Sequence, residues 1–196
     1  MVAHYHGQTW NGAELARSLA VSQPTVRRYL DALTDALVLR QLQPWHTNLG
    51  KRQVRSPKVY VRDTGLLHRL LGIDDRHALL GHPKLGASWE GFVIEQLLVR
   101  ADVRDAWFWG THGGGEIDLF FIVNGRRYGV EVKFSDAPAT TRSMRTAIDD
   151  LALDHLWIVY PGTHRYRVDT RITAWPLEDI GGLPQALRQP RKNVAR

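Results

Sequence analysis

The sequence contains no cysteine, and it contains no long apolar run. The absence of thiols excludes disulfide bonds and thiolate metal sites. No apolar stretch approaches the roughly 18–20 residues that a membrane-spanning helix needs. The first residues, MVAHYHGQTWNG, lack the apolar centre of a signal peptide. We therefore expect a cytoplasmic protein that does not contact a membrane.

Acidic residues are also in the minority, with 20 Asp and Glu against 26 Lys and Arg, a formal net charge of +6. This excess favours a polyanionic partner, with DNA as the first expectation. A hydrophobic content of 43%, including 7 Trp, is typical of a packed core rather than of a disordered chain. A length of 196 residues allows one or two domains. Nothing in the sequence indicates an oligomeric state.

The most informative stretch runs from Gly115 to Ser135 and predicts a β-hairpin. Residues 116–123 and 127–134 are rich in apolar, β-branched and aromatic residues, and Asn124-Gly125 lies between them. This dipeptide favours a type I′ turn, because both central residues of such a turn need a positive φ. A two-residue loop at this place fixes the register of the two strands.

In this register Asp118 faces Glu131, and Glu116 faces Lys133, all on one face of the hairpin. Opposed Cβ atoms lie roughly 4.5–5.5 Å apart, so Asp118 and Glu131 repel each other unless a cation lies between them. Mg²⁺ or Mn²⁺ suits carboxylate oxygens of this kind. The other interpretation is a solvated strand end with a cross-strand pair between Glu116 and Lys133. The opposite face is predicted to be core: Leu119, Phe121, Val123, Tyr128, Val130 and Val132.

The pattern of Asp118 followed across a hairpin by Glu131-Val132-Lys133 resembles the core motif of PD-(D/E)XK nucleases. The resemblance implies that Asp118 and Glu131 hold a metal ion, that Glu116 assists them, and that Lys133 orients the attacking water. It also implies a catalytic glutamate on the first core helix, for which Glu90 is the candidate. The alternative for Glu90 is an acid near a helix N-terminus, where the helix dipole favours it. The expected reaction is hydrolysis of a phosphodiester.

Other segments resemble a prokaryotic domain of unassigned function that usually follows the ATPase module of an AAA-type ATPase. They are NLGKR (48–52), SPKVY (56–60), RDTGLL (62–67), LGASWEGF (85–92) and GGEID (114–118). The sequence has no G-x-x-x-x-G-K-[ST] phosphate loop, so no nucleotide cofactor is expected. The resemblance implies an ATPase module or another protein as a partner. It also leaves an alternative function open, a non-catalytic regulatory or recognition module with a residual nuclease-like site.

Residues 1–72 predict a winged-helix domain. A helix over 11–19 is capped by Asn11, and a second helix over 23–37 is capped by Ser22. Such a helix-turn-helix can place its second helix in a DNA major groove. The apolar spacing of this second helix predicts a buried face of Val26, Tyr29, Leu30, Leu33 and Leu37.

Strands over 38–42 and 58–62 complete the predicted wing, which is rich in positive charge. Contact with nucleic-acid phosphates is one interpretation. A solvated basic loop and a docking surface for another domain are the alternatives. The candidate nucleic-acid-binding residues are Arg27, Arg28, Lys51, Arg52, Arg55 and Lys58.

Residues 85–180 predict a second domain, in the order helix, three strands, helix, strand that PD-(D/E)XK nucleases share. Ser88 is expected to cap the first of these helices, and Glu95 is expected to face solvent. His112 precedes three glycines, which permit a ligand to approach the backbone closely. His112 is expected either to assist a phosphate or a proton transfer, or to have no role.

Residues 181–196 are assigned to a tail, expected to be basic and disordered from Arg188 onward. The predicted fold class is α/β, an N-terminal winged helix followed by a PD-(D/E)XK nuclease-like mixed sheet flanked by helices.

Overall fold

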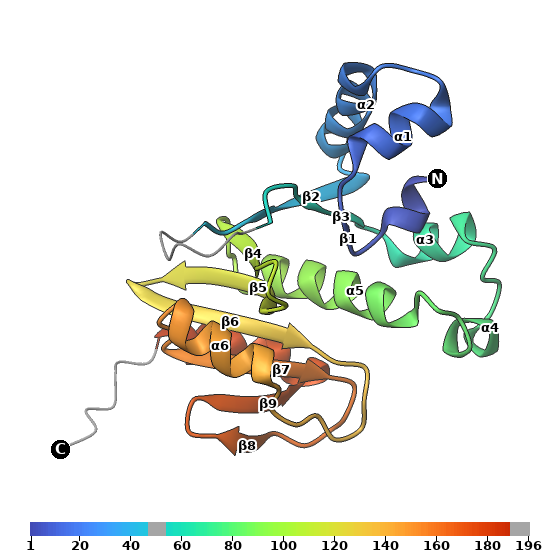
Figure 1. Ribbon diagram of the computed structural model, residues 1–196. Coiled ribbons are helices and arrows are strands. Elements are labelled where there is room, and N and C mark those ends of the chain that lie inside the picture. The colour runs from blue at the N-terminus through green and yellow to red at the C-terminus, as the bar shows by residue number, and fades with distance from the viewer. Residues whose placement is uncertain (47–53, 189–196) are drawn as a thin grey trace.

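A computed structural model describes residues 1–46 and 54–188 of the chain (Figure 1). The candidates Lys51 and Arg52 and the end of the predicted tail, 189–196, lie outside the described residues. The strands are β1 (Gln8–Thr9), β2 (Leu39–Pro44), β3 (Lys58–Val61), β4 (Ala106–Gly110), β5 (Glu116–Val123), β6 (Arg126–Val132), β7 (His155–Tyr160), β8 (Tyr166–Asp169) and β9 (Ile172–Pro176). The helices are η1 (Val2–Tyr5), α1 (Gly12–Leu19), α2 (Gln23–Asp35), α3 (Thr64–Leu70), α4 (Arg76–Leu80), α5 (Leu85–Arg100), α6 (Arg142–Asp150), η2 (Leu177–Gly182) and α7 (Leu183–Arg188).

One mixed sheet of nine strands runs through both halves of the chain, in the order β1-β3-β2-β4-β5-β6-β7-β9-β8. Its first three strands belong to the N-terminal module, which we define as residues 1–46 and 54–80. The junction is a short parallel pair in which Gln43 faces Trp107 and Pro44 faces Phe108. The two predicted domains therefore share a sheet. The fold is a mixed α/β arrangement with helices on the sheet, and the predicted order of helix, three strands, helix, strand is observed from α5 to β7.

The two N-terminal helices begin where the sequence predicts. The Asn11 side chain accepts a hydrogen bond from Glu14 N at 3.2 Å, and the Ser22 hydroxyl accepts one from Thr25 N at 3.3 Å. The predicted buried face of α2 is too wide, because only Val26 and Leu30 are buried. Tyr29, Leu33 and Leu37 are 54%, 37% and 67% exposed. Helix α2 packs against α1 and β2 along one narrow stripe, and solvent reaches the rest of its apolar surface.

The predicted hairpin and its register are confirmed. Leu119 pairs with Val130, and the pairs continue to Val123 with Arg126. Asn124 and Gly125 have φ values of +53° and +71°, as a type I′ turn requires. The neighbouring pairing with β4 contains a bulge, because Trp107 faces Phe120 whereas Trp109 faces Ile117. Strand β5 therefore holds one extra residue beside Asp118, which breaks the simple alternation of faces that the sequence predicts.

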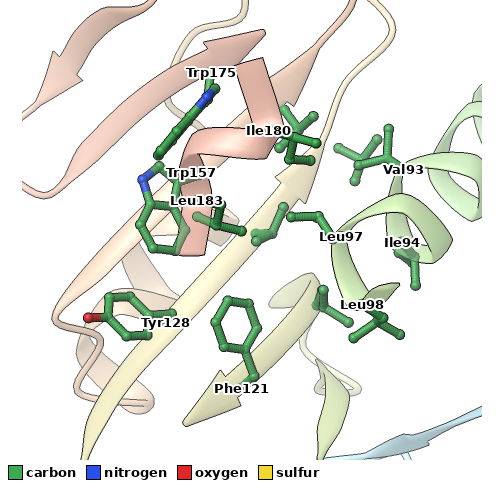
Figure 2. Close-up of a cluster of buried hydrophobic side chains, with 14 of the residues drawn as sticks. Val93, Ile94, Leu97, Leu98, Phe121, Tyr128, Trp157, Trp175, Ile180 and Leu183 are labelled. Carbon is green, nitrogen blue, oxygen red and sulfur yellow. The ribbon is translucent and has the colours of Figure 1, made fainter. Parts of the chain in front are cut away.

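The sheet carries a separate apolar core on each face. Helix α5 covers one face with Val93, Ile94, Leu97 and Leu98, which point toward side chains from the strands and from η2 and α7 (Figure 2). Helix α6 covers the other face, where its residues pack with others from β5 and β7. Ile117 and Phe120 of β5 belong to this second core. Residues 181–188 are not a separate tail, because Leu183 and Leu187 are buried in the first core, beneath α5.

Helix α5 begins at Leu85, one turn before its predicted start. The prediction that Ser88 caps this helix is therefore wrong. Ser88 lies inside the helix, is buried, and its hydroxyl is 2.7 Å from His68 Nε2. The short helix α4 lies in the stretch that the sequence assigns to a connection. Within the described ranges, no helix is both long enough and apolar enough to cross a membrane.

Candidate functional site

Four elements bring the predicted acidic residues together in one place. Strand β3 and helix α5 lie side by side (Figure 1), and β5 and β6 complete the surroundings. We call this group the carboxylate–lysine centre and define it as Lys58, Glu90, Glu116, Asp118, Glu131 and Lys133. Five of these six residues lie in regular elements, so the sheet and α5 fix the backbone from which their side chains extend.

The ammonium group of Lys58 lies at the point toward which three carboxylates converge. Its Nζ is 2.6 Å from Glu116 Oε1, 3.1 Å from Glu90 Oε1 and 3.7 Å from Asp118 Oδ1. The Lys58 side chain is only 7% exposed. Burial alone would lower the pKa of Lys58, but Glu90, Asp118 and Glu116 outweigh it and raise this pKa above its usual value. Lys58 is thus a buried, charged amine, and not the exposed phosphate-contacting lysine that the sequence predicts.

Glu90 points into the centre rather than toward solvent. Besides Lys58, its Oε1 accepts a hydrogen bond from the Tyr60 hydroxyl at 2.5 Å. Since α5 begins at Leu85, Glu90 lies beyond the first turn, where the helix dipole has little effect. Of the two interpretations of Glu90, the structure agrees with the carboxylate aimed at the cluster.

Asp118 is 8% exposed and is held against the neighbouring strand. Its Oδ2 accepts a hydrogen bond from Val132 N at 2.8 Å, next to the last regular pair of the hairpin. Burial raises the pKa of Asp118 well above its usual value, and the charges of Glu90 and Glu131 raise it further, against the effect of Lys58. The charge of Glu131 thus raises the pKa of Asp118, which agrees with the predicted register that places these two acids opposite each other.

Glu131 is 7% exposed and pairs with the lysine two residues further along. Its Oε1 is 2.7 Å from Lys133 Nζ, while its Oε2 is buried and has no hydrogen-bond partner among the described residues. Burial raises the pKa of Glu131, and Lys133 opposes the increase. The alternative cross-strand pair of Glu116 with Lys133 is not formed. Glu116 forms an ion pair with Lys58 instead, and Lys133 forms one with Glu131.

The centre suits a hard divalent cation in the chemistry of its donors. It offers four carboxylates, one of them with an unpartnered buried oxygen, and an ammonium group already stands where a cation would. The four carboxylates are not placed as the ligands of a metal ion. Within residues 1–46 and 54–188, no three His, Cys, Asp or Glu side chains are arranged to hold one. A divalent cation would therefore have to displace Lys58 and draw the carboxylates closer.

The remaining candidates lie away from this centre. Arg27, Arg28 and Arg55 are exposed, and Arg27 forms an ion pair with Asp31 at 3.1 Å. His112 is exposed on the rim of a cavity of about 590 Å³. This cavity is lined by Thr111, His112, Gly113, Gly114, Gly115, Arg142, Ser143 and Thr146.

The cavity borders the carboxylate–lysine centre through Ser143. The Ser143 hydroxyl accepts a hydrogen bond from Glu116 N at 2.7 Å and lies 2.7 Å from Glu116 O. The helix start of α6 is thereby fixed to the first residue of β5. The glycine loop and the centre are consequently neighbours, as their closeness in the sequence predicts.

Sequence reasoning missed the polar contacts between α5 and the N-terminal module. Glu95, expected to be solvated, is 8% exposed, and its carboxylate is bound by the guanidinium groups of Arg40 and Arg62. Tyr60 and Lys58 reach Glu90 from the same module. One signal was available: Glu90 and Glu95 lie in a mostly apolar helix, and buried acids need partners.

The fold and the centre together define a two-part α/β protein with a buried carboxylate–lysine cluster at the contact between its parts. Residues 1–77 match the family model described as "Domain of unknown function (DUF8612)". Residues 85–180 match the family model described as "Domain of unknown function (DUF4143)". Residues 78–84 separate the two matches and lie between the two predicted domains, 1–72 and 85–180.

Curated relatives include "Uncharacterized protein Mb2031c" of Mycobacterium bovis and "Uncharacterized protein Rv2008c" of Mycobacterium tuberculosis. Each is 59% identical over 180 residues, which is 92% of this chain and 41% of the relative. The chain thus spans less than half the length of these relatives. A solved structure, "Crystal structure of protein VC1899 from Vibrio cholerae", is similar with a TM-score of 0.34 and 12% identity, over 87% of this chain and 43% of that one.

Proposed function

We propose that this chain is the nucleic-acid-directed part of a larger protein, with a winged-helix module and a nuclease-like core of the PD-(D/E)XK type. Its carboxylate–lysine centre would hydrolyse phosphodiester bonds. One observation carries the proposal: the buried Asp118 and Glu131 and the half-exposed Lys133, the three residues of the motif, lie close to Glu90. The exposed side chains of Arg27, Arg28 and Arg55 are the proposed phosphate contacts, together with Lys51 and Arg52.

Burial of these acids supports a chemical role. Transfer of carboxylates into the interior is costly, and strongly raised carboxyl pKa values gather at functional sites. The centre has four carboxylates and two lysines, so acids exceed amines by two. The excess is two while Lys58 stays in place and three once Lys58 has left, and in either case it favours the binding of a divalent cation.

The residues divide into distinct roles. Asp118 and Glu131, with Glu116, would hold Mg²⁺ or Mn²⁺, and when bound this ion would supply a more acidic water and neutralise charge on the phosphate. Lys133 is 41% exposed, so its ammonium reaches from Glu131 toward solvent, where it would orient a water or a phosphate oxygen. Glu90, held by Tyr60, keeps negative charge at the inner side of the centre.

A second candidate function is a non-catalytic regulatory or recognition module that works beside an ATPase. The observation that favours it is the position of Lys58, whose ammonium group already lies among three of the carboxylates. The greater length of the relatives, and the resemblance to a domain that follows an AAA-type ATPase module, favour such a partner for either function.

Cleavage assays decide between the two. Labelled single-stranded DNA, double-stranded DNA and RNA are incubated with the protein in Mn²⁺ or in EDTA. We expect cleavage only with Mn²⁺, and a loss on the order of 100-fold or more in Glu131→Ala, because a group at the reacting atoms is removed. Glu178→Ala, which changes an exposed glutamate of η2, is the matched control and should cleave like the wild type. No cleavage by the wild type would favour the non-catalytic function, and equal cleavage by Glu131→Ala would assign the activity to another site.

A further inference from the structure

We infer that Lys58 is a built-in cation that closes the carboxylate–lysine centre to divalent metal ions, so that the N-terminal module controls access to it. This inference deepens the proposed function and rests on it for the identity of the centre. Strand β3 of the N-terminal module carries Lys58, whereas the carboxylates belong to α5 and β5. The N-terminal module therefore supplies the positive charge in the centre, and the rest of the chain supplies the acids.

The geometry makes occupation by Lys58 and by a metal mutually exclusive. The Lys58 Nζ lies 2.6 to 3.7 Å from three carboxylate oxygens, whereas Mg²⁺ needs oxygens at roughly 2.0–2.1 Å. An ammonium group and a divalent cation among the same oxygens would also repel each other strongly. Lys58 must leave before the acids can close on a metal.

A second feature of the centre points to a missing positive partner. Glu131 Oε2 is buried and unpartnered among the described residues, although Lys133 already binds the other oxygen of this carboxylate. Glu131 as a whole is 7% exposed. A carboxylate oxygen in such a place is stabilised by a cation, by a hydrogen-bond donor or by protonation, and the described residues supply no donor. Lys58 thus satisfies Glu90, Glu116 and Asp118 but leaves the fourth acid incompletely paired.

Lys58 is not needed to keep the N-terminal module attached to α5. Arg40 and Arg62 bind Glu95, one turn further along the same helix. His6 Nε2 is 2.9 Å from Ala87 O, and His68 binds Ser88 at the start of the helix. Because these contacts lie on both sides of Glu90, Lys58 can be removed or withdrawn while the module remains docked.

Thermal unfolding of Lys58→Met tests the inference without reference to cleavage. In EDTA the variant should melt roughly 6–15 °C below the wild type, because the largely buried Glu90 and Asp118 and the half-exposed Glu116 lose their cation. Millimolar Mn²⁺ should restore most of this loss, because the metal now enters the centre. Without nucleic acid present, the wild type should shift by less than about 2 °C with Mn²⁺, because Lys58 then occupies the centre.

Arg62→Met is the matched control, since it removes a cation that binds an acid on the same helix outside the centre. It should lower the melting temperature in EDTA, and Mn²⁺ should not restore it. Adding Asp118→Asn to Lys58→Met should abolish the recovery. If Lys58→Met does not fold in EDTA, it is refolded from denaturant in Mn²⁺, where folding would support the inference and failure would overturn it.

Equal Mn²⁺ shifts in the wild type and in Lys58→Met would also overturn the inference. Its failure is distinguishable from failure of the proposed function. Mn²⁺ recovery without cleavage leaves Lys58 as the closing cation of a non-catalytic centre. Cleavage by the wild type without any Mn²⁺ recovery in Lys58→Met leaves the hydrolase and removes the role of Lys58.

Discussion

His6 shows at the scale of one residue how the N-terminal module is fitted to α5. The ring is fully buried, Nδ1 accepts a hydrogen bond from Val61 N at 3.0 Å, and Nε2 lies 2.9 Å from Ala87 O, which assigns the proton to Nε2. A Cβ atom on Gly91 would lie 2.6 Å from His6 Nε2, so glycine at this position lets helix and ring approach. Only the neutral ring satisfies both contacts.

Burial of His6 predicts that stability depends on pH in a definite direction. Burial lowers the pKa of His6 from 6.5 to about 4, so the unfolded chain takes up a proton first as pH falls. The contribution of His6 is fully present above pH 6.5 and is lost progressively down to about pH 4, by about 3 kcal/mol. Urea denaturation between pH 7 and pH 4.5 should show a steeper loss in the wild type than in His6→Asn. His155, whose pKa is also lowered to about 4, and His68, whose pKa is lowered by burial, contribute to the slope that remains. Equal slopes in the wild type and in His6→Asn would contradict the account.

At the scale of one element, α5 joins the two halves of the chain because it is buried on two sides. Val93, Ile94, Leu97 and Leu98 face the sheet (Figure 2), while Glu90 and Glu95 meet cations of the N-terminal module. The sequence predicts local features well, including the caps of α1 and α2 and the hairpin register, because each depends on residues close in the chain. It misplaces the start of α5 and the exposure of Glu95, because these depend on partners from other elements.

Glu95 provides the prediction that belongs to this scale. Glu95→Ala leaves the guanidinium groups of Arg40 and Arg62 without their shared acid in a mostly buried place. The variant should lose about 3 kcal/mol of unfolding free energy, measured by urea denaturation. Glu95→Gln, which keeps the shape and one acceptor, should lose less, and the exposed Glu178→Ala should stay within about 0.5 kcal/mol of the wild type. A loss in Glu95→Ala no larger than in Glu178→Ala would show that these ion pairs do not hold the module.

For the whole molecule, the continuous sheet makes the two halves one structural unit. The parallel pair of β2 and β4 and the contacts of Lys58 join segments that are far apart in the sequence. The order of elements from α5 to β7 and most of the acidic cluster are predictable from the sequence, because motif and hairpin are local. The sharing of the sheet and the entry of Lys58 into the cluster are not, because no short-range pattern encodes a contact between modules.

The central claim is that Lys58 of one module and the acids of the other form a single electrostatic centre. A double-mutant cycle of Lys58→Met and Glu90→Gln, measured as unfolding free energy in EDTA, tests it most directly. Because the two side chains are 3.1 Å apart and largely buried, we predict that the losses are non-additive by about 1–3 kcal/mol. Losses that add to within about 0.5 kcal/mol would contradict the account, because the two groups would then act independently.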